Sequence, residues 1–217
     1  MFRRLINAFR SQDKSGTREV TTVAHLRVGD LMTLKSRLSL PEELQGATFE
    51  VSQVGTYQFD DGIYMQLMLT AADRSEVHLG FSPKNSQGEL CFSKTIGHGL
   101  VGSLFDEDQF SDVFEEGFST LSVNSNTEGC TGWVATEYSQ SKHMAEGYYF
   151  SRDMRGVEVS GYQDDSSEEF RYHELRGNED QYEISIEIWG DGETDISLGV
   201  YCPADVIDSL WPAESPE

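Results

Sequence analysis

Basic residues are scarce in this chain. It has 16 lysines and arginines against 38 aspartates and glutamates in 217 residues, which gives a formal net charge of −22. An acidic surface repels a phosphate backbone, so we expect no nucleic-acid partner. Cysteine is also rare, because the chain has only Cys91, Cys130 and Cys202, with no CxxC pair among them. Three widely spaced thiols predict neither a disulfide framework nor a zinc site, and they favour a reducing, cytoplasmic compartment.

Long apolar runs are missing as well. No stretch approaches the ~20 apolar residues of a membrane-spanning helix. The start, MFRRLINAFR, is basic, but its apolar residues are interrupted at Asn7 and followed by the polar SQDKSGT. A secretory signal peptide needs an apolar run of roughly 7–15 residues, so we do not expect one here.

Recognisable catalytic motifs are absent. The chain has no GxSxG, GxxxxGK[ST] or HExxH pattern, and no GxGxxG after a strand. Its five histidines are scattered without i+2 or i+4 pairs, so we expect no resident metal and no cofactor. His98 in GHGLVG is the most unusual, because the glycines around it would let a ligand approach the backbone; the alternative is an ordinary loop histidine. An enzyme is not favoured, although a site assembled from distant residues stays open.

Two groups of acidic residues could offer oxygen ligands to Ca²⁺ or Mg²⁺. Neither has the spacing of an EF-hand loop. The alternatives are a helix N-terminus for the first group and a hairpin turn for the second. The first group comprises Asp106, Glu107, Asp108 and Asp112, and the second Asp191, Glu193 and Asp195.

Charge is unevenly distributed along the chain. Residues 1–37 carry a net charge of +5 and the rest −27. Within residues 1–10 the apolar positions recur with the period of an amphipathic helix. We expect residues 1–17 to form a basic amphipathic helix and a linker, which contact a protein partner, a membrane surface or the acidic body. The candidate partner- or membrane-binding residues are Phe2, Arg3, Arg4, Leu5, Ile6, Phe9 and Arg10.

Residues 18–122 have the pattern of a β-rich segment. Gly29-Asp30 predicts a turn before a strand, and Asp61-Gly62 between two apolar runs predicts a β-hairpin. A helical turn is expected after Pro41. The apolar spacing of SLFDEDQFSDVFEEGF predicts a helix at 103–118. The predicted strands lie at 47–59, 63–71, 76–83 and 89–96.

Residues 123–217 repeat this character. The alternation in YEISIEIWG puts the apolar side chains from Tyr182 to Ile188 on one face of a strand, and Gly190–Glu193 predicts a turn after it. A short helix is expected after Pro203, at 204–211. The predicted strands lie at 131–139, 147–154, 156–162, 170–177, 182–190 and 194–202. The chain as a whole predicts an α+β fold of mostly antiparallel β-sheet, in two β-rich halves with few short helices.

Four segments carry a resemblance to a known family. They are LRVGDLMTL (26–34), FEVSQVGTYQFDDGIYMQL (49–67), GYYFSRDM (147–154) and ISLGVYCPADVI (196–207). Together they resemble the YjfK-like family of uncharacterised bacterial proteins, which are encoded beside phage-shock-protein-A-like coiled-coil proteins. The resemblance implies an accessory protein of a cytosolic, membrane-associated stress system and carries over no catalytic residue. The chain departs from the family pattern around 97–132.

These observations predict a non-enzymatic accessory or adaptor protein. It would bind a protein partner in the cytoplasm, close to the inner membrane. The resemblance implies that this partner is a phage-shock-protein-A-like protein. Residues 1–10 would add a peripheral membrane contact. The alternative is a metal-assisted hydrolase with an acidic pocket.

Overall fold

Antiparallel β-strands dominate the structure, a computed structural model that describes residues 18–124, 128–177 and 179–213. In those ranges the strands are β1 (Leu31–Leu34), β2 (Thr48–Phe59), β3 (Gly62–Ala71), β4 (Glu76–Phe81), β5 (Glu89–Ile96), β6 (Thr120–Ser122), β7 (Glu137–Phe150), β8 (Glu168–Gly177), β9 (Tyr182–Trp189), β10 (Thr194–Pro203) and β11 (Ile207–Trp211). The α-helices there are α1 (His98–Leu104) and α2 (Glu107–Asp112), and the 3₁₀ turns are η1 (Val23–His25), η2 (Glu42–Leu44), η3 (Pro83–Asn85), η4 (Gly161–Gln163) and η5 (Ala204–Val206).

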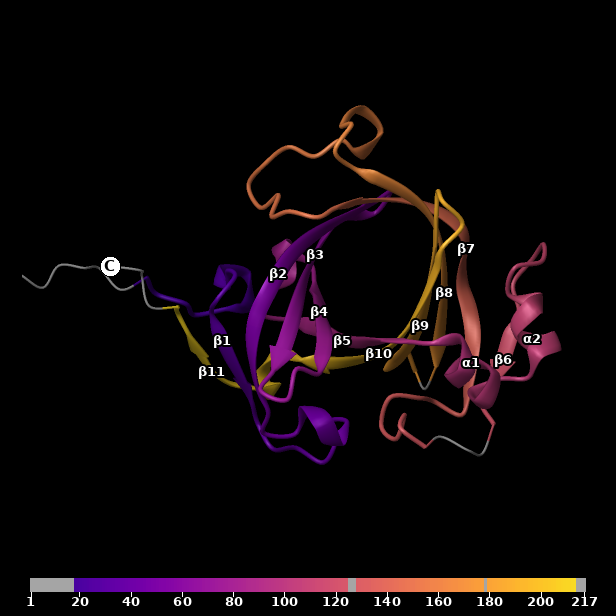
Figure 1. Cartoon of the computed structure of the whole chain (residues 1–217), viewed down its shortest axis with the longest axis horizontal. Coiled ribbons are helices and arrows are strands. Elements are labelled where there is room, and N and C mark those ends of the chain that lie inside the picture. Colours follow the sequence, from indigo (N-terminus) through magenta and orange to yellow (C-terminus); the bar gives the residue numbers. More distant parts are fainter. Residues whose placement is uncertain (1–17, 125–127, 178, 214–217) are drawn as a thin grey trace, which may run out of the picture.

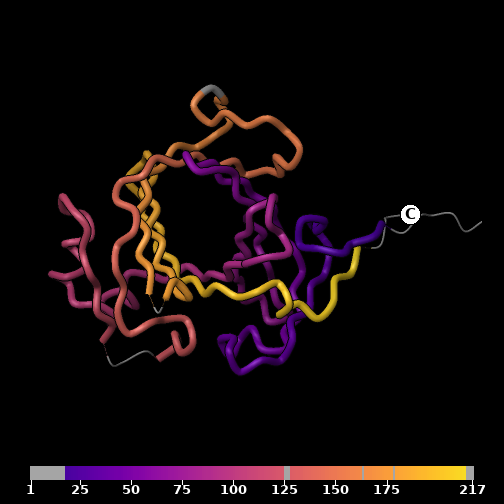
Figure 2. The backbone as a smooth tube through the Cα atoms, turned by 180° about the vertical axis from the view of Figure 1, so that it is seen from behind, coloured from indigo at the N-terminus to yellow at the C-terminus, as the bar shows by residue number. Residues whose placement is uncertain are grey.

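The strands form one sheet that closes on itself. The described strands follow the order β11-β1-β2-β3-β4-β5-β10-β9-β8-β7-β6, and β2 pairs in addition with β7. This extra pairing joins two consecutive antiparallel meanders, β2–β5 and β7–β10, into a closed ring of strands that we call the cylinder (Figures 1 and 2). The structure confirms a mostly antiparallel β-sheet. It does not confirm two separate halves, because β5 and β10 are hydrogen-bonded along their length.

The hydrophobic core lies on the outer face of the cylinder. Alternation along each strand sends every second side chain to that face. Ile184, Ile186 and Leu198 are fully buried there, in one cluster with side chains from η1, η2 and α1. The strand alternation predicted for residues 182–190 is therefore confirmed. The predicted hairpin at Asp61-Gly62 is confirmed too, with Gly62 at φ 153°.

The helix predicted at 103–118 is wrong. The chain forms two shorter helices, α1 and α2, separated by an extended Phe105. Phe105 is buried and makes an isolated β-bridge to Val123, so tertiary packing interrupts the helical period. Asp106 then caps α2, because its carboxylate accepts hydrogen bonds from the backbone N–H groups of Asp108 and Gln109.

The predicted strand at 156–162 is also wrong, and the one predicted at 131–139 begins only at Glu137. Residues 131–136 form a turn before β7, where Gly132 has φ +81° and Trp133 is buried with its backbone N–H bonded to the Cys130 carbonyl. Residues 156–162 lie in a loop between β7 and β8 that contains η4. Gly156, at φ +74°, reverses the chain within it.

The predicted C-terminal helix at 204–211 is wrong. Only η5 is helical, and residues 207–211 form β11, which pairs with β1. A strand is favoured here because β1 offers it a partner. The Arg37 guanidinium fixes the corner by pairing with both carboxylate oxygens of Asp205 at 2.9 Å.

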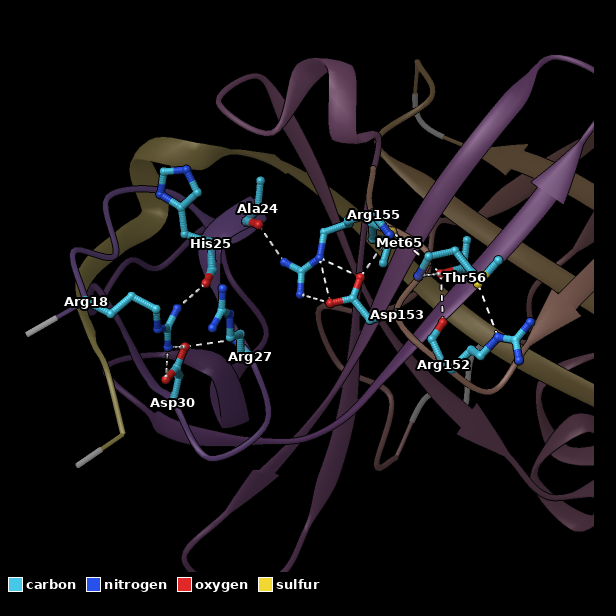
Figure 3. Close-up of polar contacts among 11 residues, drawn as sticks. Arg18, Ala24, His25, Arg27, Asp30, Thr56, Met65, Arg152, Asp153 and Arg155 are labelled. Carbon is cyan, nitrogen blue, oxygen red and sulfur yellow. Dashed lines mark hydrogen bonds and ion pairs between the residues drawn. The ribbon is translucent and has the colours of Figure 1, made fainter. Parts of the chain in front are cut away.

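A buried carboxylate ties the two ends of the described chain together. Asp30, with no exposed surface, accepts hydrogen bonds from the Arg18 guanidinium and, at 2.8 Å, from the backbone N–H groups of Arg27 and Ala213. Figure 3 shows Arg18 and Arg27 converging on Asp30. Burial by itself would raise the pKa of Asp30, but these hydrogen bonds hold it below its usual value.

Hydrogen bonds fasten the loop between β7 and β8 to β2 and to η1 (Figure 3). The Thr56 hydroxyl donates to the Arg152 carbonyl at 2.9 Å and accepts from the backbone N–H of Met154 at 3.1 Å. The Arg155 guanidinium donates to the Ala24 carbonyl in η1. Contacts from β2 and η1 thus hold this loop at one end of the cylinder.

Candidate functional site

The inner face of the cylinder surrounds a cavity of about 280 Å³. Each strand of the cylinder contributes to its wall. One lining residue from each strand, in sequence order, is Tyr57, Gln66, Gly80, Cys91, Lys142, Glu174, Glu187 and Tyr201. Since the apolar core occupies the other face, the interior is lined mainly by polar and aromatic side chains.

Strand register places the charged lining residues side by side. Arg176 of β8 pairs with Glu183 of β9, Glu174 with Ser185, and Tyr172 with Glu187. Directly opposite residues on one face of an antiparallel pair have their side chains in contact range. Two neighbouring strands therefore bring three glutamates, one arginine and one tyrosine to a single wall.

Arg176 is the centre of a buried ion network. Its Nε lies 2.8 Å from Glu174 Oε1 and its Nη2 lies 2.9 Å from Glu183 Oε2, while its guanidinium lies 4.4 Å from the centroid of the Tyr201 ring. Burial by itself would raise the pKa of Glu174, but Arg176 and Lys142 lower it to about 2. Glu174 is therefore a carboxylate at neutral pH.

Lys142 places a second cation in the wall. Its Nζ lies 3.4 Å from Glu174 Oε2 and 3.6 Å from Asp61 Oδ2. The same ammonium lies 5.4 Å from the centroid of the Phe59 ring and 5.6 Å from that of Tyr172. Two carboxylates and two aromatic faces thus surround one ammonium ion.

Glu187 has a different environment. Within the described residues, its carboxyl accepts one hydrogen bond, from the Tyr57 hydroxyl at 3.2 Å, and has no basic partner. Removal from water raises its pKa to about 8, and the charges of Asp195 and Glu183 act in the same direction. The Glu187 side chain is therefore mostly neutral at pH 7, whereas Glu174 is ionised.

This contrast gives the cavity both a proton donor and a carboxylate. Divergent pKa values among neighbouring titratable groups are a mark of functional sites. Cys91 offers no nucleophile, because burial raises the pKa of its thiol well above the usual value. The wall can hydrogen-bond, accept cations and stack against rings.

The residues predicted to bind a partner or membrane, Phe2, Arg3, Arg4, Leu5, Ile6, Phe9 and Arg10, lie outside the described residues. The two groups of acidic residues that could have bound Ca²⁺ or Mg²⁺ begin at a helix N-terminus and in a hairpin turn, respectively. Asp106 caps α2, and Asp191 accepts a hydrogen bond from the backbone N–H of Glu193 in the turn between β9 and β10. His98 begins α1. In the part of the chain that the structure describes, no group of three or more His, Cys, Asp or Glu side chains could hold a metal ion.

The fold brings two histidines together that are distant in the sequence. The His143 and His173 rings lie 5.0 Å apart, and the Nε2 atoms of both are buried without a hydrogen-bond partner among the described residues. Gln140 donates from Nε2 to His173 Nδ1 at 3.1 Å, because its Oε1 already accepts from Ser119. His173 Nε2 therefore carries the proton in the neutral ring and has no lone pair for a metal.

Sequence patterns did not predict the cavity residues. The apolar half of the alternation in residues 182–190 predicted a buried face, whereas the other half, Glu183, Ser185 and Glu187, predicted no role. A signal was present, because the neighbouring strand HELR also alternates, with Glu174 and Arg176 on its polar face. Closure of the sheet makes that polar face an interior, and no local pattern predicts closure.

No family model, curated protein or solved structure matches this chain. The resemblance to the YjfK-like family stays a prediction. Among the described residues, no helix is both long and apolar enough to cross a membrane.

Proposed function

We propose that this protein binds a small ligand inside the cylinder. The observation that carries the proposal is that every strand of the cylinder contributes to one cavity, whose wall is polar and aromatic instead of aliphatic. Buried ionic groups are costly to a fold compared with apolar side chains of similar size. A sheet that already has an apolar core on its outer face gains little stability from such an interior, so we assign the interior to binding.

The size of the cavity limits the ligand. At about 280 Å³ it lies just below the range for small-molecule pockets, roughly 300–1,000 Å³. Aromatic side chains such as Tyr57, Phe59 and Tyr172 offer flat surfaces to one part of the ligand, and the glutamates offer hydrogen-bond acceptors to another. A compact molecule with one polar end and one apolar end fits this wall.

The test is a variant that fills the cavity. A Cβ atom at Gly80 would lie 3.7 Å from the Cys91 carbonyl oxygen, an ordinary contact, so Gly80→Leu adds a side chain to the cavity without a backbone clash. The matched control is Gly102→Leu on α1, where the described residues leave open space around the Cβ position. Three aromatic probes of similar size are titrated by calorimetry: phenethylammonium, 2-phenylethanol and phenylacetate.

Binding of at least one probe to the wild type and to Gly102→Leu, and its loss in Gly80→Leu, supports the proposal. The proposal is wrong if none of the three binds the wild type. It is equally wrong if Gly80→Leu binds them as the wild type does. Unfolding midpoints of both variants check that the fold is retained.

The adaptor role remains a second candidate, because the sheet has an open edge. Strand β11 has one neighbour in the described sheet, β1, so one row of its backbone groups is available to another chain. Trp211, 57% exposed, lies opposite the partly exposed Leu31 on this edge. Exposed aromatic side chains on a free edge fit a partner that adds a strand or packs on the sheet end.

A binding experiment separates the adaptor role from cavity binding. A purified phage-shock-protein-A-like protein from the same organism is titrated against the wild type, Trp211→Ser and a chain lacking residues 2–10. Loss of binding in Trp211→Ser assigns the contact to the β11 edge, and loss on deletion assigns it to the basic segment. Co-sedimentation of the wild type and of the deletion variant with anionic vesicles tests the predicted membrane contact. The prediction is wrong if the wild type stays in the supernatant at low salt.

The metal-assisted hydrolase stays the alternative prediction. Calorimetric titration with Mg²⁺, Mn²⁺, Ca²⁺ and Zn²⁺ tests it, because micromolar binding that Asp106→Ala or Asp191→Ala removes would favour it. Absence of heat with all four ions would contradict it.

A further inference from the structure

We propose that the ligand of the cavity is an organic ammonium ion with an apolar or aromatic body, held by the Glu187 carboxyl and the Tyr57 hydroxyl. This inference rests on the proposed function and names its ligand class. It is drawn from two observations: the wall already holds two cations of the protein, and the Glu187 carboxyl has no basic partner among the described residues.

The first observation is the surroundings of Lys142. Its ammonium lies between Glu174 and Asp61 and close to the rings of Phe59 and Tyr172. An ammonium ion near an aromatic face is attracted by the ring quadrupole, and more strongly where water is excluded. The cavity wall is therefore built to hold an alkylammonium, which in this case belongs to the chain itself.

The second observation is the environment of Arg176. Its guanidinium contacts the carboxylates of Glu174 and Glu183 and lies against the Tyr201 ring. The same combination of carboxylate and ring recurs here with a different cation. Glu187 and Tyr57 repeat the combination a third time, with a hydrogen bond of 3.2 Å between them and no basic group against Glu187 among the described residues.

An anionic ligand fits the wall less well. Among the described lining residues, Glu89, Glu174, Glu183 and Glu187 are acidic, whereas Lys142 and Arg176 are basic. Both basic groups are already engaged by carboxylates. A carboxylate or phosphate would therefore enter a cavity whose cations are occupied, at a cost in repulsion.

A proton accompanies the binding. The titratable groups that face Glu187 are Tyr57 of β2, Tyr149 of β7, Tyr172 of β8, Glu183 of β9 and Asp195 of β10. Burial and the charges of Asp195 and Glu183 raise the pKa of Glu187 and favour its neutral form in the empty cavity, whereas the hydrogen bond from Tyr57 lowers that pKa. An ammonium ion favours the carboxylate, and the displaced proton passes to the buffer.

The experiment uses the charge series of the three aromatic probes on the full chain. Phenethylammonium is expected to bind roughly tenfold or more tightly than 2-phenylethanol, because a charged hydrogen bond is stronger than a neutral one. Its affinity rises by up to about tenfold per pH unit as the pH rises towards 8. Titrations at pH 7 in phosphate and in Tris differ in apparent enthalpy, because a proton is released into buffers of different ionisation enthalpy.

Two variants locate the contact. Glu187→Gln keeps the shape of the side chain, and we expect it to remove both the preference for phenethylammonium over 2-phenylethanol and the proton release. Glu193→Gln, on the exposed turn between β9 and β10, is the matched control and should behave as the wild type.

The outcomes distinguish the two proposals. If 2-phenylethanol or phenylacetate binds as tightly as phenethylammonium, and Gly80→Leu removes that binding, the ammonium inference is overturned and the cavity function stands. If phenethylammonium binds equally well to Glu187→Gln, the assigned contact is wrong. If no probe binds the wild type, the cavity function itself fails.

Discussion

Asp30 is fully buried at the junction of the described chain ends, and Glu187 is partly buried on the cavity wall; their carboxyl groups have opposite surroundings. Around Asp30, an arginine and two backbone N–H groups satisfy the carboxylate at the junction of the described chain ends. Around Glu187, on the cavity wall, a single tyrosine hydroxyl is the hydrogen-bond partner within the described residues. The pKa of Asp30 is lowered and that of Glu187 is raised to about 8.

This difference separates a structural role from a binding role. A buried carboxylate whose hydrogen bonds are filled by the protein holds its region together and has no capacity left for a ligand. A carboxyl that the fold leaves without a cation costs stability when it ionises and gains an interaction when a cation arrives.

Replacement of Asp30 should have the largest effect. Asp30→Ala leaves Arg18 and two backbone N–H groups without their acceptor, and we expect the free energy of unfolding to fall by about 3–5 kcal/mol. Urea denaturation measures the loss. The control, Asp165→Ala on the exposed loop before β8, should change stability by less than about 0.5 kcal/mol. If both variants lost a similar free energy of unfolding, Asp30 would contribute no more to stability than an exposed aspartate.

The second prediction concerns pH. Because the pKa of Glu187 rises from 4.5 in the unfolded chain to about 8 in the folded one, its contribution to stability is fully present below about pH 4.5 and is lost as the pH rises through 8. Asp30, with a lowered pKa, contributes in the opposite sense, and its stabilisation is lost as the pH falls below 3.8. Glu187→Gln should remove the first dependence and leave the second.

The measurement is the difference in unfolding free energy between Glu187→Gln and the wild type from pH 5 to pH 8. We expect this difference to grow in favour of the variant by at most about 1.4 kcal/mol per pH unit. A constant difference over this range would mean that Glu187 is ionised in the folded protein. The contrast with Asp30 would then be lost.

Removal of one partner of Asp30 should have an intermediate effect. Arg18→Gln takes away the guanidinium but leaves the two backbone hydrogen bonds, so we expect a loss of about 1–3 kcal/mol. The midpoint of acid unfolding should also move to higher pH, because Arg18 lowers the pKa of Asp30. Lys84→Gln, at an exposed position, should change neither quantity.

Removal of the partner of Glu187 should have the smallest effect. Tyr57→Phe deletes one hydrogen bond and should cost about 0.5–1.5 kcal/mol. Because that hydrogen bond lowers the pKa of Glu187, its loss should raise the midpoint of the Glu187 titration, followed by the NMR shift of its carboxyl carbon. Tyr162→Phe, 84% exposed, is the control. A downward shift would contradict the assigned hydrogen bond.

Sequence patterns predicted those parts of the fold that depend on neighbouring residues. The hairpin at Asp61-Gly62 follows from glycine's access to positive φ, and the strand at 182–190 follows from its alternation. The predicted helix at 103–118 failed because Phe105 leaves the helix to pair with Val123, an interaction between positions 18 residues apart. Residues 207–211 became strand β11 because β1 lies beside them.

The sequence by itself determined the acidic character of the chain, its antiparallel strands and the two-sided alternation within them. Only the tertiary structure decided that the polar side of that alternation faces inward. The pairings of β5 with β10 and of β2 with β7 join residues about 100 positions apart, and they close the sheet. Closure turns Glu174, Arg176 and Glu187 from apparent surface residues into the wall of a cavity. Burial and the charges of neighbouring strands then set the ionisation of these side chains.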